Sequence, residues 1–113
     1  MQVQRFRGWL VLEVLEDLDM ASAPALRQRA LAQLSAGERM LAIDLTHADF
    51  LDSTGLGTLV AILKRVRLHD GELAVICPEP RLRRVFELTD LEGVLGVCAA
   101  RADLAEVTRG PGT

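Results

Sequence analysis

The chain has 113 residues, of which 50% are hydrophobic and 26% are charged, as expected for one globular domain. Its formal net charge is −3 at pH 7, so it lacks the basic surface that binds DNA or an anionic membrane. Its aromatic residues are one Trp and three Phe, too few for a platform that stacks single-stranded nucleic acid. We therefore expect no nucleic-acid partner.

Membrane and secretion signals are also missing from the sequence. No apolar run approaches the roughly 20 residues that a membrane-spanning helix needs. The first residues lack the basic segment and the long apolar core of a secretion signal. We expect a cytoplasmic protein with no direct membrane insertion.

The amino-terminal third predicts a hairpin followed by a helix. Residues 3–6 alternate, Arg7 and Gly8 form a turn, and residues 9–15 are a dense apolar run. This pattern predicts an edge strand that a tight turn joins to a buried strand. In the helix that follows, Ser22 is a plausible N-cap, Pro24 lies in the first turn and Gly37 marks the exit.

The rest of the chain alternates apolar strands with helices. Strands are predicted over residues 40–45, 72–77 and 94–98. Helices are predicted from about Thr54, from the pair Pro78 and Pro80, and over a final turn or two within residues 101–107. The helix that starts near Thr54 has one buried face, formed by Leu56, Leu59, Val60, Leu63 and Val66.

This alternation predicts an α/β fold. We expect a mostly parallel mixed sheet of about five strands, with an antiparallel edge strand and about four helices. Residues 1–108 should form the single domain and residues 109–113 a flexible tail. Cys77 and Cys98 lie in apolar strand-like segments outside any Cys-x-x-Cys pair, so we expect two buried free thiols.

The most informative stretch is residues 52–57, Asp-Ser-Thr-Gly-Leu-Gly, where a buried strand is followed by an amphipathic helix. A hydroxyl there can cap the helix, bind an anion or be phosphorylated, and Ser53 is the predicted N-cap. Gly55 and Gly57 each cost up to about 1 kcal/mol against alanine in a first helical turn. Two glycines therefore indicate that a neighbouring strand or a partner protein approaches the backbone closely.

Catalytic and cofactor sites are weakly indicated. The stretch lacks the lysine of a nucleotide P-loop, the third glycine of a dinucleotide fingerprint and the Gly-x-Ser-x-Gly elbow. Asp44, Asp49 and Asp52 could bind Mg²⁺, but solvated loop acids are the favoured interpretation because nothing here holds a nucleotide. We expect no catalytic residue, no metal, no cofactor and no enzymatic activity.

The run LTHADFLDSTGLG, residues 45–57, resembles the signature of the STAS domain family, the bacterial anti-sigma-factor antagonists. In that family a strand ending in Asp-Leu-Ser precedes an apolar-Asp-Ser-Ser/Ala-Gly-Leu segment that opens a helix. The pair Leu18-Asp19 and the segment of residues 70–73 extend the resemblance over nearly the whole chain. Glu16 departs from the family, whose members often have Gly there.

The resemblance implies a partner-switching protein. Family members bind an anti-sigma factor that is also a serine kinase, which frees a sigma factor, and phosphorylation of the serine matching Ser53 ends that binding until a serine phosphatase restores it. The family loop matching residues 16–20 also contacts the kinase. The implied phosphoacceptor is Ser53 rather than Thr54, and the implied partner-binding residues are Asp19, Asp52, Ser53, Thr54, Gly55 and Leu56.

Two other functions stay open. STAS domains also serve as accessory subunits of lipid-type ABC transporters and as components of stressosome-like scaffolds. Chain length does not separate these alternatives. We expect a monomer or weak dimer in each case.

Overall fold

The computed structural model describes residues 1–106, in which five strands form one mixed sheet. The strand order in the sheet follows the chain, with β1 antiparallel to β2 and the remaining pairs parallel. The predicted α/β class and the antiparallel edge strand are confirmed. The strands are β1 (Gln2–Phe6), β2 (Trp9–Glu13), β3 (Met40–Asp44), β4 (Glu72–Ile76) and β5 (Val97–Cys98).

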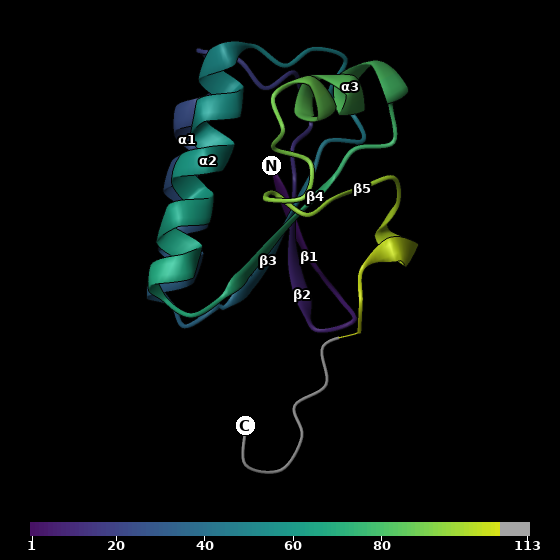
Figure 1. Ribbon diagram of the computed structural model, residues 1–113. Helices are drawn as coiled ribbons and strands as arrows, with labels where there is room; N and C mark the ends of the chain where they lie inside the picture. The colour runs from purple at the N-terminus through teal and green to yellow at the C-terminus, as the bar shows by residue number, and fades with distance from the viewer. Residues whose placement is uncertain (107–113) are drawn as a thin grey trace.

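The hairpin between β1 and β2 closes through Arg7 and Gly8. Both residues have positive φ, 52° and 88°, as a two-residue turn of type I′ requires. This turn geometry matches the right-handed twist of the strands that it joins. The β1–β2 hairpin therefore forms one edge of the sheet (Figure 1).

The described residues contain three α-helices, one fewer than predicted. They are α1 (Ala23–Ser35), α2 (Ser53–Leu68) and α3 (Pro80–Leu88). The fourth expected helix is a single 3-10 turn, η1 (Arg101–Asp103), because the backbone becomes extended at Leu104, which is buried against the sheet. The expected helical residue 107, the domain end at 108 and the tail 109–113 lie outside the described residues.

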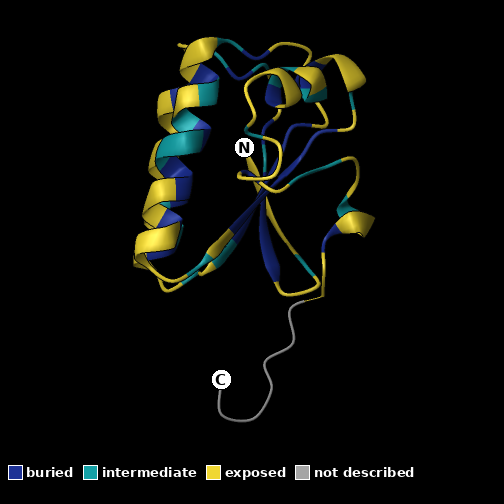
Figure 2. Ribbon diagram, viewed as in Figure 1, coloured by how far each residue is buried: buried dark blue, intermediate teal, exposed yellow. Residues whose placement is uncertain are grey.

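The three α-helices contribute to the larger of two apolar clusters, on one face of the sheet (Figures 1 and 2). In α2 the buried stripe differs from the prediction, because Ile62 is fully buried whereas Leu56 and Val60 are half-buried. No helix among residues 1–106 is long and apolar enough to cross a bilayer. The largest fully buried side chains in this cluster are Phe86, Leu12, Leu18, Leu26, Leu34, Leu41, Ile43, Leu45, Leu59, Ile62 and Leu95.

The opposite face of the sheet has a smaller apolar cluster covered by residues 99–106, here called the C-terminal segment. Leu104 packs on this face with Trp9, whose indole N–H donates to the Ala105 carbonyl at 2.7 Å. The Arg7 guanidinium donates to the carbonyls of Ala102 and Leu104 at 3.1 and 3.3 Å. The C-terminal segment, which contains a 3-10 turn but no α-helix, therefore covers the face of the sheet opposite the α-helices.

The last strand is shorter than predicted. The expected strand over residues 94–98 is reduced to Val97–Cys98, because residues 92–96 form a turn that ends at Gly96 with φ 59°. Gly96 also lies against β4, since a Cβ there would be 2.9 Å from the Leu73 carbonyl oxygen. The turn therefore needs glycine both for its conformation and for its close packing.

The two cysteines are free, but only Cys77 is fully buried, and the prediction of two buried thiols was wrong for the half-buried Cys98. Cys77 packs in the cluster on the helical face and Cys98 against the cluster on the other face. Burial raises the pKa of the Cys77 thiol to about 11 and also raises the pKa of Cys98. The fold therefore keeps Cys77 protonated and out of reach of solvent.

We predict that an aromatic disulfide reagent at pH 8 modifies native protein at Cys98 and leaves Cys77 unmodified until the chain unfolds. A thiol with pKa about 11 is ionised at pH 8 in only about one molecule in a thousand, and the thiolate is the nucleophile. Mass spectrometry of the native and the denatured protein checks this, with Cys98→Ser as the control. Modification of Cys77 in native Cys98→Ser would contradict the described burial.

Candidate functional site

The candidate site is built from two loops, residues 14–22 and 45–52, which follow the carboxyl ends of β2 and β3. The loops pair through an isolated parallel bridge between Leu18 and Leu51. Leu18 N donates to the Phe50 carbonyl at 3.1 Å, and Asp52 N donates to the Leu18 carbonyl at 3.3 Å. Side chains strengthen the pairing, because Asp17 Oδ1 accepts from the backbone N–H groups of Asp49 and Phe50 at 2.7 and 3.1 Å. The two loops therefore form one hydrogen-bonded unit.

Asp52, not Ser53, is the N-cap of α2. Its Oδ1 accepts from Gly55 N at 2.8 Å, while its other oxygen, Oδ2, accepts from Met20 N at 3.2 Å. Aspartate is as good an N-cap as serine, and this one also bonds the neighbouring loop, which the shorter serine side chain at the next position does not do. The predicted capping role of Ser53 was therefore wrong, whereas the predicted helix start at about Thr54 agrees with the observed start at Ser53.

Ser53 is the first helical residue and is exposed to solvent. Its hydroxyl makes no hydrogen bond with any of the residues that the structure describes. Thr54 is also exposed, and it lines a groove of about 390 Å³ between α1 and α2 together with Arg27 and Thr58. The Ser53 hydroxyl is therefore available for chemistry at the amino end of a 16-residue helix.

The two glycines of the motif differ in what surrounds them. Gly55 is buried, and a Cβ there would lie 2.4 Å from the Leu18 carbonyl oxygen and 2.9 Å from Leu51 Cδ1. Of the two explanations that the sequence left open, a neighbouring segment of the same fold accounts for Gly55. Gly57 is exposed, and a Cβ there would meet nothing within 4 Å.

Asp19 shapes the loop that precedes α1. Its Oδ1 accepts from the backbone N–H groups of Ala21 and Ser22, and the hydrogen bond from Ser22 N lowers the pKa of the Asp19 carboxyl. Ser22 is the N-cap residue of α1, as predicted, but its side chain makes no capping hydrogen bond to the helix. Its Oγ instead donates to the Asp17 carbonyl and accepts from Asp19 N, since the loop offers closer partners.

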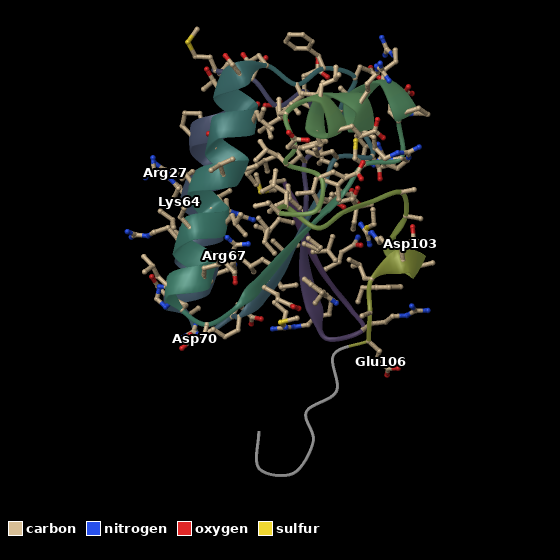
Figure 3. All side chains as sticks on the ribbon, viewed as in Figure 1. Arg27, Lys64, Arg67, Asp70, Asp103 and Glu106 are labelled. Carbon is tan, nitrogen blue, oxygen red and sulfur yellow. The ribbon has the colours of Figure 1, made fainter. Side chains whose placement is uncertain are left out.

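The surface around Ser53 is apolar and acidic. Met20 is 73% exposed and Phe50 is 54% exposed, so two large apolar side chains contribute to this surface. Leu56 is half-buried and packs against the core, so its contribution to the surface is partial. Figure 3 shows Arg27 and Lys64 on the outer side of the helix pair, and Arg27 lines the same groove as Thr54. The loops carry five carboxylates and no lysine or arginine: Glu16, Asp17, Asp19, Asp49 and Asp52.

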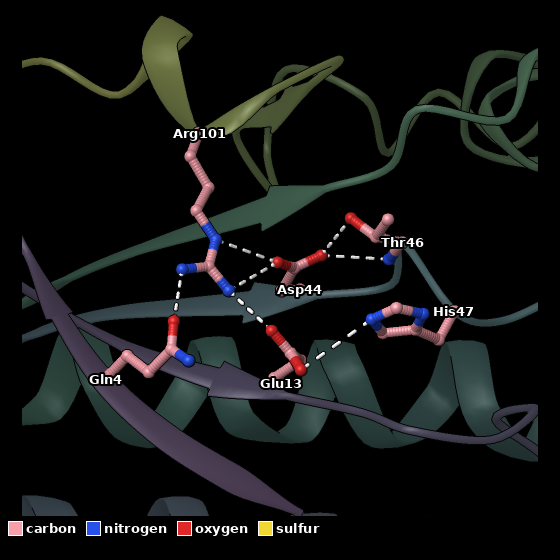
Figure 4. Close-up of polar contacts among 6 residues, drawn as sticks. All are labelled: Gln4, Glu13, Asp44, Thr46, His47 and Arg101. Atoms are coloured by element: carbon pink, nitrogen blue, oxygen red, sulfur yellow. Dashed lines mark hydrogen bonds and ion pairs between the residues drawn. The ribbon is translucent and has the colours of Figure 1, made fainter.

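Asp44 is a buried, paired acid, so its interpretation as a solvated loop acid was wrong. Its side chain is 3% exposed, its Oδ2 lies 2.9 Å from Arg101 Nη2, and its Oδ1 accepts from Thr46 N at 2.8 Å (Figure 4). Among residues 1–106 no group of His, Cys, Asp and Glu side chains could hold a metal ion. The three acids that could have formed a Mg²⁺ site thus have separate roles in the fold or on its surface.

Sequence reasoning identified the motif but missed several residues of the site. The capping role of Asp52 had a signal, because aspartate is as favourable an N-cap as serine and stands directly before the helix. Asp17, Met20 and Phe50 had no such signal, because their contacts and exposure depend on how two loops about 30 residues apart pair. Arg101 was missed for the same reason.

Comparisons with known proteins agree with this architecture. The STAS domain family matches residues 1–105 of the chain. An anti-sigma-B factor antagonist of Staphylococcus aureus is 32% identical over 81 residues, which are 72% of this chain and 75% of that protein. A putative anti-sigma factor antagonist of Bordetella bronchiseptica, BtrV, is 28% identical over 99 residues, which are 88% of this chain and 85% of that protein.

A solved structure gives the same result in three dimensions. The crystal structure of an anti-sigma factor antagonist from Mycobacterium paratuberculosis superposes with a TM-score of 0.79 at 31% sequence identity. The match covers 90% of this chain and 86% of that chain. The five-stranded sheet and its helices are therefore those of a known fold.

We predict that Gly55→Ala destabilises the free domain whereas Gly57→Ala does not. The added methyl at position 55 would clash with the Leu18 carbonyl and should cost about 1–3 kcal/mol by overpacking. The same methyl at position 57 meets open space and should stabilise α2 by up to about 1 kcal/mol. Urea unfolding of both variants measures the two free energies. A Gly55→Ala variant as stable as the parent would show that the Leu18 loop gives way.

Proposed function

This chain belongs to the STAS domain family, and from that premise we propose that it is an anti-sigma factor antagonist switched by phosphorylation at Ser53. Unmodified, it binds an anti-sigma factor that is also a serine kinase, and the bound kinase releases its sigma factor. Phosphorylation of Ser53 by that kinase ends the binding, and a serine phosphatase restores it. The observation that carries the proposal is an exposed, unbonded hydroxyl at a helix amino end, inside an apolar and acidic surface.

Binding is supported by the rigidity and composition of the surface. Because the two loops are hydrogen-bonded to each other, Met20 and Phe50 are presented without a large cost of ordering. Large exposed apolar side chains of this kind are typical anchors of protein interfaces. The partner contacts proposed from the sequence lie at this surface, with Gly55 buried beneath it: Asp19, Asp52, Ser53, Thr54 and Leu56.

Release on phosphorylation is supported by charge. A phosphate adds about −1.5 to −2 charges at pH 7 to a surface whose two loops carry five carboxylates and no lysine or arginine. A partner surface complementary to the neutral hydroxyl would have to desolvate this group without a matching cation, which costs several kcal/mol. Binding is therefore lost through repulsion and desolvation.

The fold itself should tolerate the phosphate. Ser53 is the first residue of α2, where the helix dipole favours negative charge. The hydroxyl makes no hydrogen bond to the described residues that phosphorylation would break. The switch then works by changing the charge of a fixed surface, in a monomer or weak dimer, with no conformational change.

The names of the relatives favour this function over the two alternatives considered. The Staphylococcus aureus, Bordetella bronchiseptica and Mycobacterium paratuberculosis proteins are all named anti-sigma factor antagonists. A gene neighbourhood with a histidine-kinase-like ATPase and a sigma factor would favour the same function, whereas a permease with an ATPase would favour a transporter subunit.

We predict that the anti-sigma factor kinase of the same genome phosphorylates Ser53 and not Thr54. Both residues are exposed, but Ser53 is unbranched and stands at the turn, whereas β-branched Thr54 lies one position further into the helix. Incubation with kinase and ATP followed by mapping with mass spectrometry tests this. Thr54→Ala, the matched control, should still be phosphorylated, and phosphate on Thr54 in the Ser53→Ala variant would refute the assignment.

We predict that Ser53→Asp abolishes binding to that kinase while the thermal midpoint stays within a few degrees of the parent. An acid in the first helical turn is favourable for α2, so the fold should be unaffected. Calorimetric titration and thermal unfolding give the two quantities, with Ser53→Asn as the uncharged control that should retain binding. A midpoint lowered by more than about 8 °C, roughly 1–2 kcal/mol at this size, would indicate a folding defect instead.

A further inference from the structure

A polar cluster lies on the face of the sheet opposite the α-helices. It connects the positions at which loops 14–22 and 45–52 begin. Glu13 is the last residue of β2 and Asp44 the last residue of β3, and they are direct neighbours in the parallel register. Loop 14–22 starts immediately after Glu13, and loop 45–52 starts immediately after Asp44. Two adjacent carboxylates on one face of a sheet repel each other unless a cation lies between them.

Arg101 is that cation (Figure 4). Its Nη2 lies 2.7 Å from Glu13 Oε2 and 2.9 Å from Asp44 Oδ2, and its Nε donates to the same Asp44 oxygen at 3.0 Å. Its Nη1 donates to Gln4 Oε1 in the edge strand. The guanidinium thus uses all three nitrogens to connect β1, β2 and β3 from one position in η1.

The connection continues from the strand ends into the loops. The second oxygen of Asp44 accepts from both the backbone N–H and the hydroxyl of Thr46, the second residue of loop 45–52. The Asp44 carbonyl accepts from Val14 N, the first residue of loop 14–22, at 3.0 Å. His47 Nε2 lies 3.7 Å from Oε1 of Glu13, the other oxygen of that carboxylate. Arg101 therefore holds the residues from which both loops depart.

We propose that Arg101 is a positioning residue for the Ser53 surface. By neutralising Glu13 and Asp44 together it fixes the separation of the ends of β2 and β3, and with it the pairing of Leu18 with Leu51 and of Asp52 with Met20. Without the guanidinium, two poorly solvated carboxylates face each other and the strand ends separate. The positioning role rests on these contacts alone, whereas its effect on partner binding rests on the proposed function.

Hydrogen–deuterium exchange tests the positioning role without a partner. In Arg101→Ala the amides of Leu18, Phe50 and Asp52 should exchange about tenfold faster or more, while amides of central β3 and β4 keep their protection. Arg7→Ala is the matched control, because it removes the contacts of Arg7 to Ala102 and Leu104 of the C-terminal segment and leaves the carboxylate pair intact. Its loop amides should exchange at the parental rate.

Two further variants distinguish the loss of the Arg101 charge from a general loss of stability. Arg101→Lys, which supplies a cation but lacks the fork that reaches both carboxylates, should give intermediate exchange. Adding Glu13→Gln to Arg101→Ala removes the repulsion and should restore part of the loop protection. Equal acceleration of loop and strand amides in Arg101→Ala, unchanged loop amides, or no recovery in the double variant would each overturn the proposal.

Affinity for the anti-sigma factor kinase then tests the link to function. Arg101→Ala should weaken the complex about tenfold or more, and Arg7→Ala should leave it unchanged. If the kinase does not bind even the parent protein, the proposed function fails while the exchange experiment still decides the positioning role. Faster loop exchange in Arg101→Ala with unchanged affinity would overturn the link to partner binding.

Discussion

The Asp52 carboxylate is the contact on which the geometry of the Ser53 surface depends. One oxygen caps α2 through Gly55 N and the other holds loop 14–22 through Met20 N, so a single side chain fixes a helix start and a neighbouring loop. Capping contributes about 0.5–2 kcal/mol, and a bond between loops is gained at little further entropy cost because both loops are already paired. With Asp52 in the capping role, the hydroxyl of the next residue has no structural bond to lose.

Because Asp52 caps the helix and Ser53 does not, the stability of the helix start is independent of chemistry at the Ser53 hydroxyl. In a serine that capped the helix, phosphorylation would convert the capping hydroxyl into a phosphate ester, so the helix start would be tied to the charge state. Here a carboxylate caps the helix and the serine is exposed beside it. A surface of this kind can alternate between two charges while the backbone stays in one conformation, which is the property that a reversible binding switch requires.

The sequence predicted what depends on local pattern. Strand and helix alternation, the Arg7-Gly8 turn and the strand–helix junction at residues 52–57 all follow from periodicity and turn chemistry, and the structure contains them. The predicted N-cap was wrong at Ser53, whereas Ser22 is the N-cap residue of α1 without a side-chain capping bond. Asp52, one residue before Ser53, accepts from Gly55 N, and propensity alone does not rank two good capping residues in one turn. The Ser22 hydroxyl instead bonds Asp17 and Asp19 in the loop before α1.

What the sequence could not predict depends on contacts between distant segments. A glycine at position 55 indicated a close approach but not that the Leu18 carbonyl is the neighbour, because that contact exists only when the two loops pair. Asp44 looked like a loop acid because its cation is 57 residues away, on a 3-10 turn of the C-terminal segment. The short β5 likewise reflects Gly96 packing on β4, which no local pattern encodes.

The partly buried ion cluster of Glu13, Asp44 and Arg101 is better explained by geometry than by stability. An arginine between the buried Asp44 and the partly buried Glu13 loses part of the hydration of all three groups, and apolar side chains in place of buried ion pairs are often as stabilising or better, by about 1–4 kcal/mol. The face of the sheet opposite the α-helices offers an apolar environment for such a replacement, because Trp9, Ala42 and Ile76 pack there. The cluster stands instead where β2 and β3 end and both loops begin. Charged groups there set the distance and register of two strand ends through directional contacts, which non-directional apolar packing would do less strictly.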